Sequence, residues 1–135
     1  MFRVKGIDHV VIRARDLERM VSFYRDVLGC AVERRRDDLG LVHLRAGASL
    51  IDLVSVEGRL GRPGGAGPGA EGRNMAHLCL RVEPFDYGEL SSHFAGLGVA
   101  VGGEERNYGA EGDGPSFYLS DPEGNTVELK GPAAA

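Results

Sequence analysis

The chain is poor in features that mark several large classes of protein. Only two of its 135 residues are cysteine, and none is tryptophan. Cys30 and Cys79 lie in separate apolar segments without C-x-x-C spacing, which predicts two reduced, buried thiols rather than a disulfide framework. A chain of this length buries enough surface for an ordinary hydrophobic core without such crosslinks.

Long apolar runs and an excess of basic residues are also missing. No stretch approaches the roughly 20 apolar residues that a membrane-crossing helix needs, and residues 1–12 carry charges where a signal peptide is apolar. We therefore expect a cytoplasmic protein with no membrane partner. The 16 Lys and Arg residues are outnumbered by 20 Asp and Glu, for a net charge of −4, so nucleic acid is not an expected partner.

The chain contains an internal repeat. Residues 7–12 and 75–80 each predict a short β-strand with a histidine at its third position, His9 and His77. Each strand is followed by an amphipathic helix that begins at an aspartate and ends at a glycine, and then by three more strands. The sequence thus predicts an α+β fold in which two βαβββ modules pair into a curled mixed sheet within a single domain, residues 1–135.

The module boundaries follow from the glycine content. The first module is expected at residues 5–57 and the second at 74–131, with the glycine-rich residues 58–73 as a flexible linker between them. Residues 99–101 are expected to form the second strand of the second module. A further glycine-rich stretch, 107–115, is expected to be a loop, either solvent-exposed and mobile or in contact with substrate.

Two kinds of metal-binding side chain recur with the modules. His9 and His77 each stand on an otherwise apolar strand face, and the last strand of each module carries an acid, Asp52 or Glu128. A lone carboxylate is costly to bury without a partner or a cation. Two histidines with one or two carboxylates suit Mn, Fe, Co, Ni or Zn. A buried His–carboxylate network that holds the modules together explains the same pattern, and spacing alone leaves both interpretations open.

At these positions the chain resembles the vicinal oxygen chelate superfamily, which includes glyoxalase I, fosfomycin-resistance thiol transferases and extradiol dioxygenases. The resemblance rests on the two histidine-bearing segments, on F-Y-R-D-V-L-G at 23–29 and on D-P-E-G-N-T-V-E at 121–128. It implies a homodimer, one divalent metal ion per site, and His9, His77 and Glu128 as ligands, with Asp52 at a fourth place. Glyoxalase I has Glu there, so the shorter Asp52 is expected to bind directly, to bind through water or to serve as a base.

Residues 106–118 also resemble the loop and strand that line the substrate pocket of fosfomycin-resistance enzymes. This resemblance implies that Arg106 meets an anionic substrate and that Tyr118 donates a hydrogen bond to it. A solvated arginine and a packed tyrosine are the structural alternatives.

The function that follows is a metal-dependent lyase or isomerase of the glyoxalase type, acting on a small molecule with two neighbouring oxygens. The metal would polarise a carbonyl and stabilise an enediolate, while Glu128 or Asp52 would move the proton. One alternative is extradiol dioxygenation at a 2-His-1-carboxylate iron site. Others are fosfomycin-type thiol transfer, with glutathione or another thiol as cosubstrate, and metal-free ligand binding by a dimer similar to bleomycin-resistance proteins.

Overall fold

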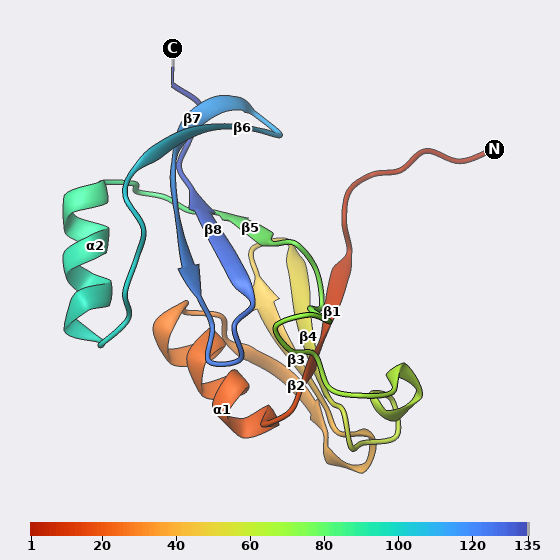
Figure 1. The fold of residues 1–135 in the computed structure, drawn as a ribbon. Helices are drawn as coiled ribbons and strands as arrows, with labels where there is room; N and C mark the ends of the chain where they lie inside the picture. Colours follow the sequence, from red (N-terminus) through yellow and green to blue (C-terminus); the bar gives the residue numbers. More distant parts are fainter. Residues whose placement is uncertain (135) are drawn as a thin grey trace. The chain divides into compact units, whose positions relative to one another are not determined.

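The computed structural model describes residues 1–134, which divide into two compact units (Figure 1). The first unit is Met1–Asn74, and the second begins at Met75. Along the chain the elements are β1 (His9–Ala14), α1 (Leu17–Ser22), a π-helical turn (Phe23–Val27), β2 (Val32–Arg36), a 3-10 turn (Asp37–Leu39), β3 (Leu41–Ala46), β4 (Ser49–Ser55), a second 3-10 turn (Arg62–Gly64), β5 (Leu78–Arg81), α2 (Tyr87–Gly96), β6 (Glu105–Gly109), β7 (Gly112–Ser120) and β8 (Thr126–Lys130).

The two units have the same sheet topology, which confirms the predicted duplicated α+β fold. The strand order is β1-β4-β3-β2 in the first unit and β5-β8-β7-β6 in the second. In each sheet the first and last strands of the unit pair in parallel, and the other neighbours pair antiparallel. Each sheet is therefore mixed and remains open at both edges.

In the first unit one face of the sheet packs on the helix and the other carries the polar side chains. Ile12 of β1 and Ile51 and Leu53 of β4 are buried, as is Met20 of α1, and α1 contacts β4. Because side chains alternate along a strand, Asp52 lies on the face opposite to Ile51 and Leu53. The sheet thus presents its functional candidates on the face that does not contact the helix.

Both helices begin where the sequence predicts, but the first changes from α-helix to π-helix at Phe23 before the chain reaches Gly29. The Asp16 side chain accepts a hydrogen bond from the backbone N–H of Arg19 at 3.1 Å, and Asp86 accepts one from Glu89 at 2.9 Å. These N-caps satisfy backbone donors that have no partner within the helix. Gly29 and Gly98 follow the two helical segments with φ of 74° and 75°, a conformation that glycine adopts without steric cost.

The first strand of each unit begins later than predicted. β1 starts at His9, and β5 starts at Leu78, so His77 lies one residue before its strand instead of within it. Pairing between β5 and β8 begins with Leu78 and Val127, so His77 lies where the chain enters the sheet. The side-chain direction of His77 is therefore set by the chain leading into β5.

The prediction of a loop at residues 107–115 is wrong. Residues 105–109 and 112–120 form the β6–β7 hairpin, with Gly109 opposite Gly112. Gly112 has φ of 112°, which favours glycine at the turn. The strand predicted at 99–101 is reduced to one bridge between Val101 and Leu119, since β6 takes the sheet edge instead.

The segment 58–73 is tied to β1 instead of crossing as a free linker. The Arg13 guanidinium donates to the backbone oxygens of Gly61 (3.1 Å), Gly65 (2.6 Å) and Ala66 (3.0 Å). The segment has few apolar side chains to bury. The charge-assisted hydrogen bonds from Arg13 to its backbone therefore order the segment instead of apolar packing.

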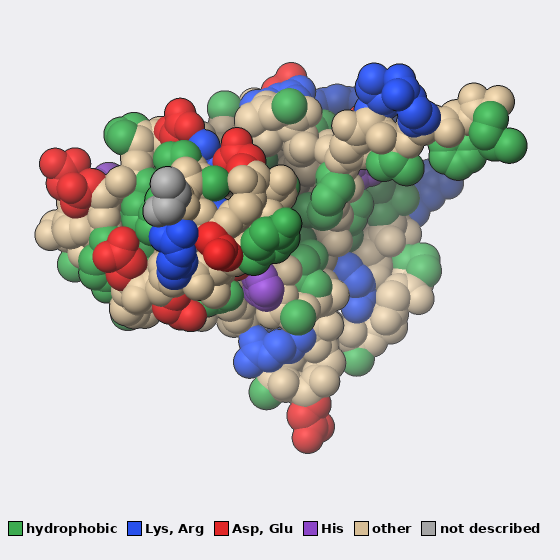
Figure 2. Space-filling view, turned by 90° about the horizontal axis from the view of Figure 1, so that it is seen from above, with side chains coloured by type: hydrophobic (Ala, Val, Ile, Leu, Met, Phe, Trp, Pro, Cys, Tyr) green, Lys and Arg blue, Asp and Glu red, His purple; other side chains and the backbone are tan. Residues whose placement is uncertain are grey.

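Two of the three consecutive arginines on β2 form ion pairs with nearby acids. Arg35 forms ion pairs with Glu18 and Asp37, and Arg36 pairs with Asp38. On the face shown in Figure 2, Lys and Arg side chains lie in several separate groups, with no single basic patch covering it. Among residues 1–134 there is no helix long and apolar enough to cross a membrane.

Candidate functional site

The acid of the second unit, Glu128, occupies the middle of β8 with a neighbour on each side. It pairs with Cys79 of β5 and with Tyr118 of β7. Only 6% of the Glu128 side chain is exposed. Burial of a carboxylate is costly unless hydrogen bonds or a cation compensate for the lost water, so the partners of Glu128 are informative.

His77 contacts only one of the two carboxylate oxygens of Glu128. Its Nε2 lies 3.2 Å from Glu128 Oε1, and the imidazole meets the Tyr118 ring edge-to-face with centroids 5.5 Å apart. Glu128 Oε2 is buried and has no hydrogen-bond partner within the described residues. The predicted residues His77, Glu128 and Tyr118 are thus brought together, and one carboxylate oxygen is left for a further group.

The Glu128 carboxylate also influences its two strand neighbours. Desolvation, followed by the Glu128 charge, raises the pKa of Tyr118 above its usual value, which is already well above neutral pH. Desolvation and then Glu128 raise the pKa of Cys79 to about 11, which leaves the thiol protonated and weakly nucleophilic. Both cysteines are free as predicted, but Cys79 is exposed, because it lies on the edge strand β5.

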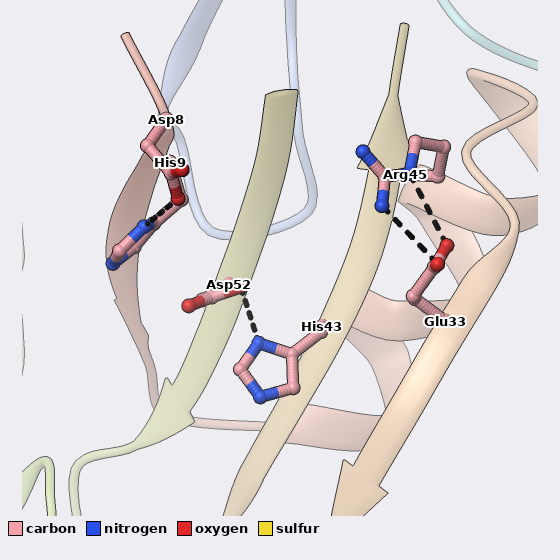
Figure 3. Close-up of polar contacts among 6 residues, drawn as sticks. All are labelled: Asp8, His9, Glu33, His43, Arg45 and Asp52. Atoms are coloured by element: carbon pink, nitrogen blue, oxygen red, sulfur yellow. Dashed lines mark hydrogen bonds and ion pairs between the residues drawn. The ribbon is translucent and has the colours of Figure 1, made fainter. Parts of the chain in front are cut away.

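In the first unit, Asp52 occupies the place of Glu128. It pairs with Val11 of β1 and with His43 of β3, as Glu128 pairs with Cys79 and Tyr118. Asp52 Oδ1 lies 2.7 Å from Nδ1 of His43. Figure 3 marks this contact between the two side chains. His43 is not among the predicted site residues, although the repeat contained the signal, since His43 stands opposite the acid as Tyr118 does.

His9 has a different partner from its counterpart His77. Its Nδ1 lies 2.7 Å from Oδ1 of Asp8, and both side chains are exposed (Figure 3). The hydrogen bond with Asp8 raises the pKa of His9, and the more distant charge of Asp52 adds to the effect. Glu128 contacts His77, which lies just before the first strand of its unit, whereas the shorter Asp52 contacts His43 on the neighbouring strand β3.

Arg106 lies outside this group of side chains. It is exposed on β6, and its Nη2 donates to the backbone oxygen of Ala134 at 2.8 Å. The neighbouring residue on β6, Asn107, donates to the Ser116 hydroxyl at 2.7 Å. Arg106 thus fastens the hairpin to the C-terminal segment, whatever else it binds.

The donor set fits a divalent metal ion, but neither unit supplies a full set. In residues 1–134 no three His, Cys, Asp or Glu side chains gather closely enough to form a metal centre. Imidazole nitrogen and carboxylate oxygen are suitable ligands for Zn, Ni, Co, Mn and Fe. The free Oε2 of Glu128 beside the His77 imidazole is the feature expected where a cation completes the coordination of a buried carboxylate.

Two repeated units of mixed sheet, each with a histidine at or just before its first strand and an acid on its last strand, define a class of duplicated α+β proteins with candidate metal ligands. The sequence model of the Glyoxalase/Bleomycin resistance protein/Dioxygenase superfamily matches residues 6–129. The chain belongs to this superfamily.

The relatives of this chain include a virulence protein and a glutathione transferase. The virulence protein STM3117 of Salmonella typhimurium is 32% identical over 93% of this chain and 83% of its own length. Its crystal structure superimposes with a TM-score of 0.81 over 98% of this chain and 100% of that one, at 25% identity. The glutathione transferase FosA of Serratia marcescens is 25% identical over 93% of this chain and 80% of its own length.

A lactoylglutathione lyase from Agrobacterium tumefaciens has the same fold. Its structure superimposes with a TM-score of 0.68 over 96% of this chain and 95% of that one, at 23% identity. The shared fold does not by itself identify the reaction of this chain.

Proposed function

We propose that this chain is a metal-dependent lyase or isomerase of the glyoxalase type, acting on a small substrate that presents two neighbouring oxygens. The observation that supports this proposal is the buried Glu128 carboxylate, with one oxygen facing His77 and the other unpaired. Superfamily membership is consistent with enzymatic activity of this kind.

His77 and Glu128 are the proposed core of the metal site, and His9 is a further proposed ligand. When bound, a divalent ion supplies Lewis-acid polarisation of a substrate carbonyl. Asp52 is expected either to bind the metal or to take part in proton movement. Its hydrogen bond with His43 favours the second role.

Other residues of the chain position the substrate. The Tyr118 hydroxyl, which is protonated at neutral pH as in an ordinary tyrosine, is the proposed hydrogen-bond donor to the substrate beside Glu128. Arg106 is exposed on β6 and is the proposed contact for an anionic group of the substrate. We propose that the chain acts in the cytoplasm as a homodimer, as is typical of the superfamily.

The test begins with the metal. Untagged protein purified without chelator is analysed for metal per chain, then loaded separately with Ni, Co, Mn, Fe and Zn. Each form is assayed with the hemithioacetal of glutathione and a 2-oxoaldehyde, by following formation of the thioester product. We expect near-stoichiometric metal and metal-dependent turnover. Failure to bind any of these ions contradicts the proposal and favours a metal-free ligand-binding protein.

Thiol transfer to an epoxide is the second candidate, because a glutathione transferase is among the relatives that match 93% of the chain. The same metal-loaded samples are incubated with glutathione and fosfomycin, and the adduct is measured by mass spectrometry. Adduct formation without hemithioacetal turnover selects this reaction. Oxygen consumption with a catechol by the Fe(II) form alone would instead select extradiol dioxygenation.

A further inference from the structure

We propose that residues 2–7, which we call the N-terminal arm, form a strand that pairs with the open edge of β6 in a second copy of this chain. The pairing is antiparallel and reciprocal, so that each copy gives one arm and receives one. This inference rests on the proposed homodimer and names the surfaces that hold it together, but it does not depend on the proposed reaction.

The arm is fastened to the first unit only at its inner end. The Ser49 hydroxyl donates to the Ile7 carbonyl oxygen at 2.6 Å, and the Leu50 backbone N–H donates to the carbonyl oxygen of Asp8 at 3.0 Å. In Figure 1 the chain before β1 runs on from the end of that strand. No hydrogen bond joins residues 2–6 to the rest of the described chain, so their backbone groups are available to a partner.

The side chains of the arm alternate as in a strand that has one apolar face. Phe2 and Val4 are 80% and 83% exposed, and the basic residues Arg3 and Lys5 alternate with them. Because successive side chains of a strand point to opposite faces, the extended arm has an apolar face and a basic face. Neither Arg3 nor Lys5 forms an ion pair in the described part of the chain.

The strand β6 has backbone groups that face an open edge. It lies at the end of the second sheet and pairs only with β7. Pro115, opposite Arg106, has no N–H to donate, and its carbonyl oxygen accepts from Gly131 instead. The carbonyl oxygen of Asp113, opposite Tyr108, likewise accepts from the C-terminal segment. Since antiparallel pairs alternate between bonded and non-bonded, the N–H and C=O groups of Arg106 and Tyr108 point away from β7.

The side chains along this edge complement those of the arm. The aromatic residue Tyr108 is 82% exposed. Glu104 and Glu105 are also exposed, and neither forms an ion pair within residues 1–134. An antiparallel register can place Phe2 opposite Tyr108. The same register places Lys5 opposite Glu105, so a single alignment forms an aromatic pair and an ion pair, both of which stabilise paired strands.

A second copy of this chain is the partner that these charges favour. Two arms do not suit each other, because their basic residues would lie together. The edge strand β2 is excluded for the same reason, since it carries three consecutive arginines. Every copy has both the basic arm and the acidic edge, and both are exposed within one chain. Reciprocal exchange about a two-fold axis uses each arm and each edge once, which closes the assembly as a dimer and covers an open strand edge.

The first measurement is the dissociation constant of the dimer, obtained by analytical ultracentrifugation of metal-free protein over a range of concentrations. We expect Lys5→Glu and Glu105→Lys each to raise the Kd about tenfold, because each change replaces attraction with repulsion at two symmetric interfaces. The combined variant should restore the Kd toward the wild-type value. The control is Arg19→Glu, the same kind of charge reversal at an exposed position on α1, which should keep the wild-type Kd.

The second measurement tests the register and separates exchange from contact within one chain. Val4 lies opposite Arg106 in the proposed register, and the Cα separation of about 5.5 Å in such a pair permits a disulfide. In a Cys79→Ser background, chains with Val4→Cys are mixed with chains carrying Arg106→Cys under mild oxidation. We expect a mixed covalent dimer on non-reducing electrophoresis. When one chain carries both changes, an internal disulfide in a monomer would overturn the proposal, as would cross-linking of two Val4→Cys chains to each other.

The outcomes distinguish this inference from the proposals on which it builds. A dimer whose Kd is unchanged by both Lys5→Glu and Glu105→Lys refutes the arm interface and leaves the homodimer standing. A wild type that is monomeric at every concentration contradicts the homodimer and this inference together. The metal and turnover assays are separate measurements, so failure of the proposed reaction is recognised independently.

Discussion

Glu128 Oε1 lies 3.2 Å from His77 Nε2, while Glu128 Oε2 is buried without a partner among the described residues. An unsatisfied buried polar atom costs about 1–3 kcal/mol, so the fold tolerates a penalty at this place. A cation bound by the two side chains would remove that penalty, which gives the arrangement a physical reason.

Removing either proposed ligand of the second unit is expected to abolish metal binding. His77→Ala or Glu128→Gln should lower bound metal from near one equivalent to background, because each removes a donor that no other side chain replaces. Elemental analysis after dialysis measures this. His93→Ala, on the exposed surface of α2, serves as the matched control and should retain its metal.

Metal is expected to stabilise the folded wild type. A ligand at about 100 times its Kd adds roughly 2.7 kcal/mol to the free energy of unfolding. Thermal unfolding with and without metal should therefore show a rise in Tm for the wild type and no rise for Glu128→Gln. An equal rise in both proteins would place the metal elsewhere.

The pH dependence of His9 follows from its bond with Asp8. This hydrogen bond raises the pKa of His9 above its usual 6.5, since it favours the protonated ring. The stabilising pair is therefore fully present below pH 6.5 and is lost as the pH rises through the higher folded-state pKa. An NMR titration of metal-free protein should show the raised value, and Asp8→Asn should lower it toward 6.5.

Cys79 is expected to react slowly despite its exposure. With a pKa of about 11, only about one thiol in a thousand is ionised at pH 8, and the thiolate is the reactive form. The rate of alkylation by iodoacetamide should rise about tenfold per pH unit up to that pKa. Glu128→Gln should speed the reaction at pH 8, because the Glu128 charge raises the Cys79 pKa. A rate that is independent of Glu128 would contradict the contact.

The β6–β7 hairpin is expected to depend on glycine at position 114. A Cβ on Gly114 would lie 2.7 Å from the Pro132 carbonyl oxygen and 2.9 Å from Lys130 Nζ, closer than real contacts allow. Gly114→Ala should therefore lower the free energy of unfolding by about 1–3 kcal/mol, as overpacking does. Gly96→Ala at the end of α2 meets no atom within 4 Å, so urea unfolding should show it neutral or slightly stabilising.

The repeat and its helices were readable from the sequence because their signals are local. Asp16 and Asp86 cap their helices, Gly29 and Gly98 follow them with positive φ, and both sheets have the same strand order. Such features depend on residues a few positions apart. The hairpin at 105–120 was missed because glycine content indicates a loop locally, whereas pairing with β8 makes β7 a central strand.

The types of functional side chain were determined by the sequence alone: histidines near the first strands, acids on the last strands, and a tyrosine in the second module. Only the tertiary structure decided their partners. Strand register places His43 opposite Asp52 and Tyr118 opposite Glu128, and the sequence does not fix that register, because a shift of one residue along a hairpin changes every pair. The side chain of Glu128 is one methylene longer than that of Asp52. Glu128 contacts His77, and Asp52 contacts His43.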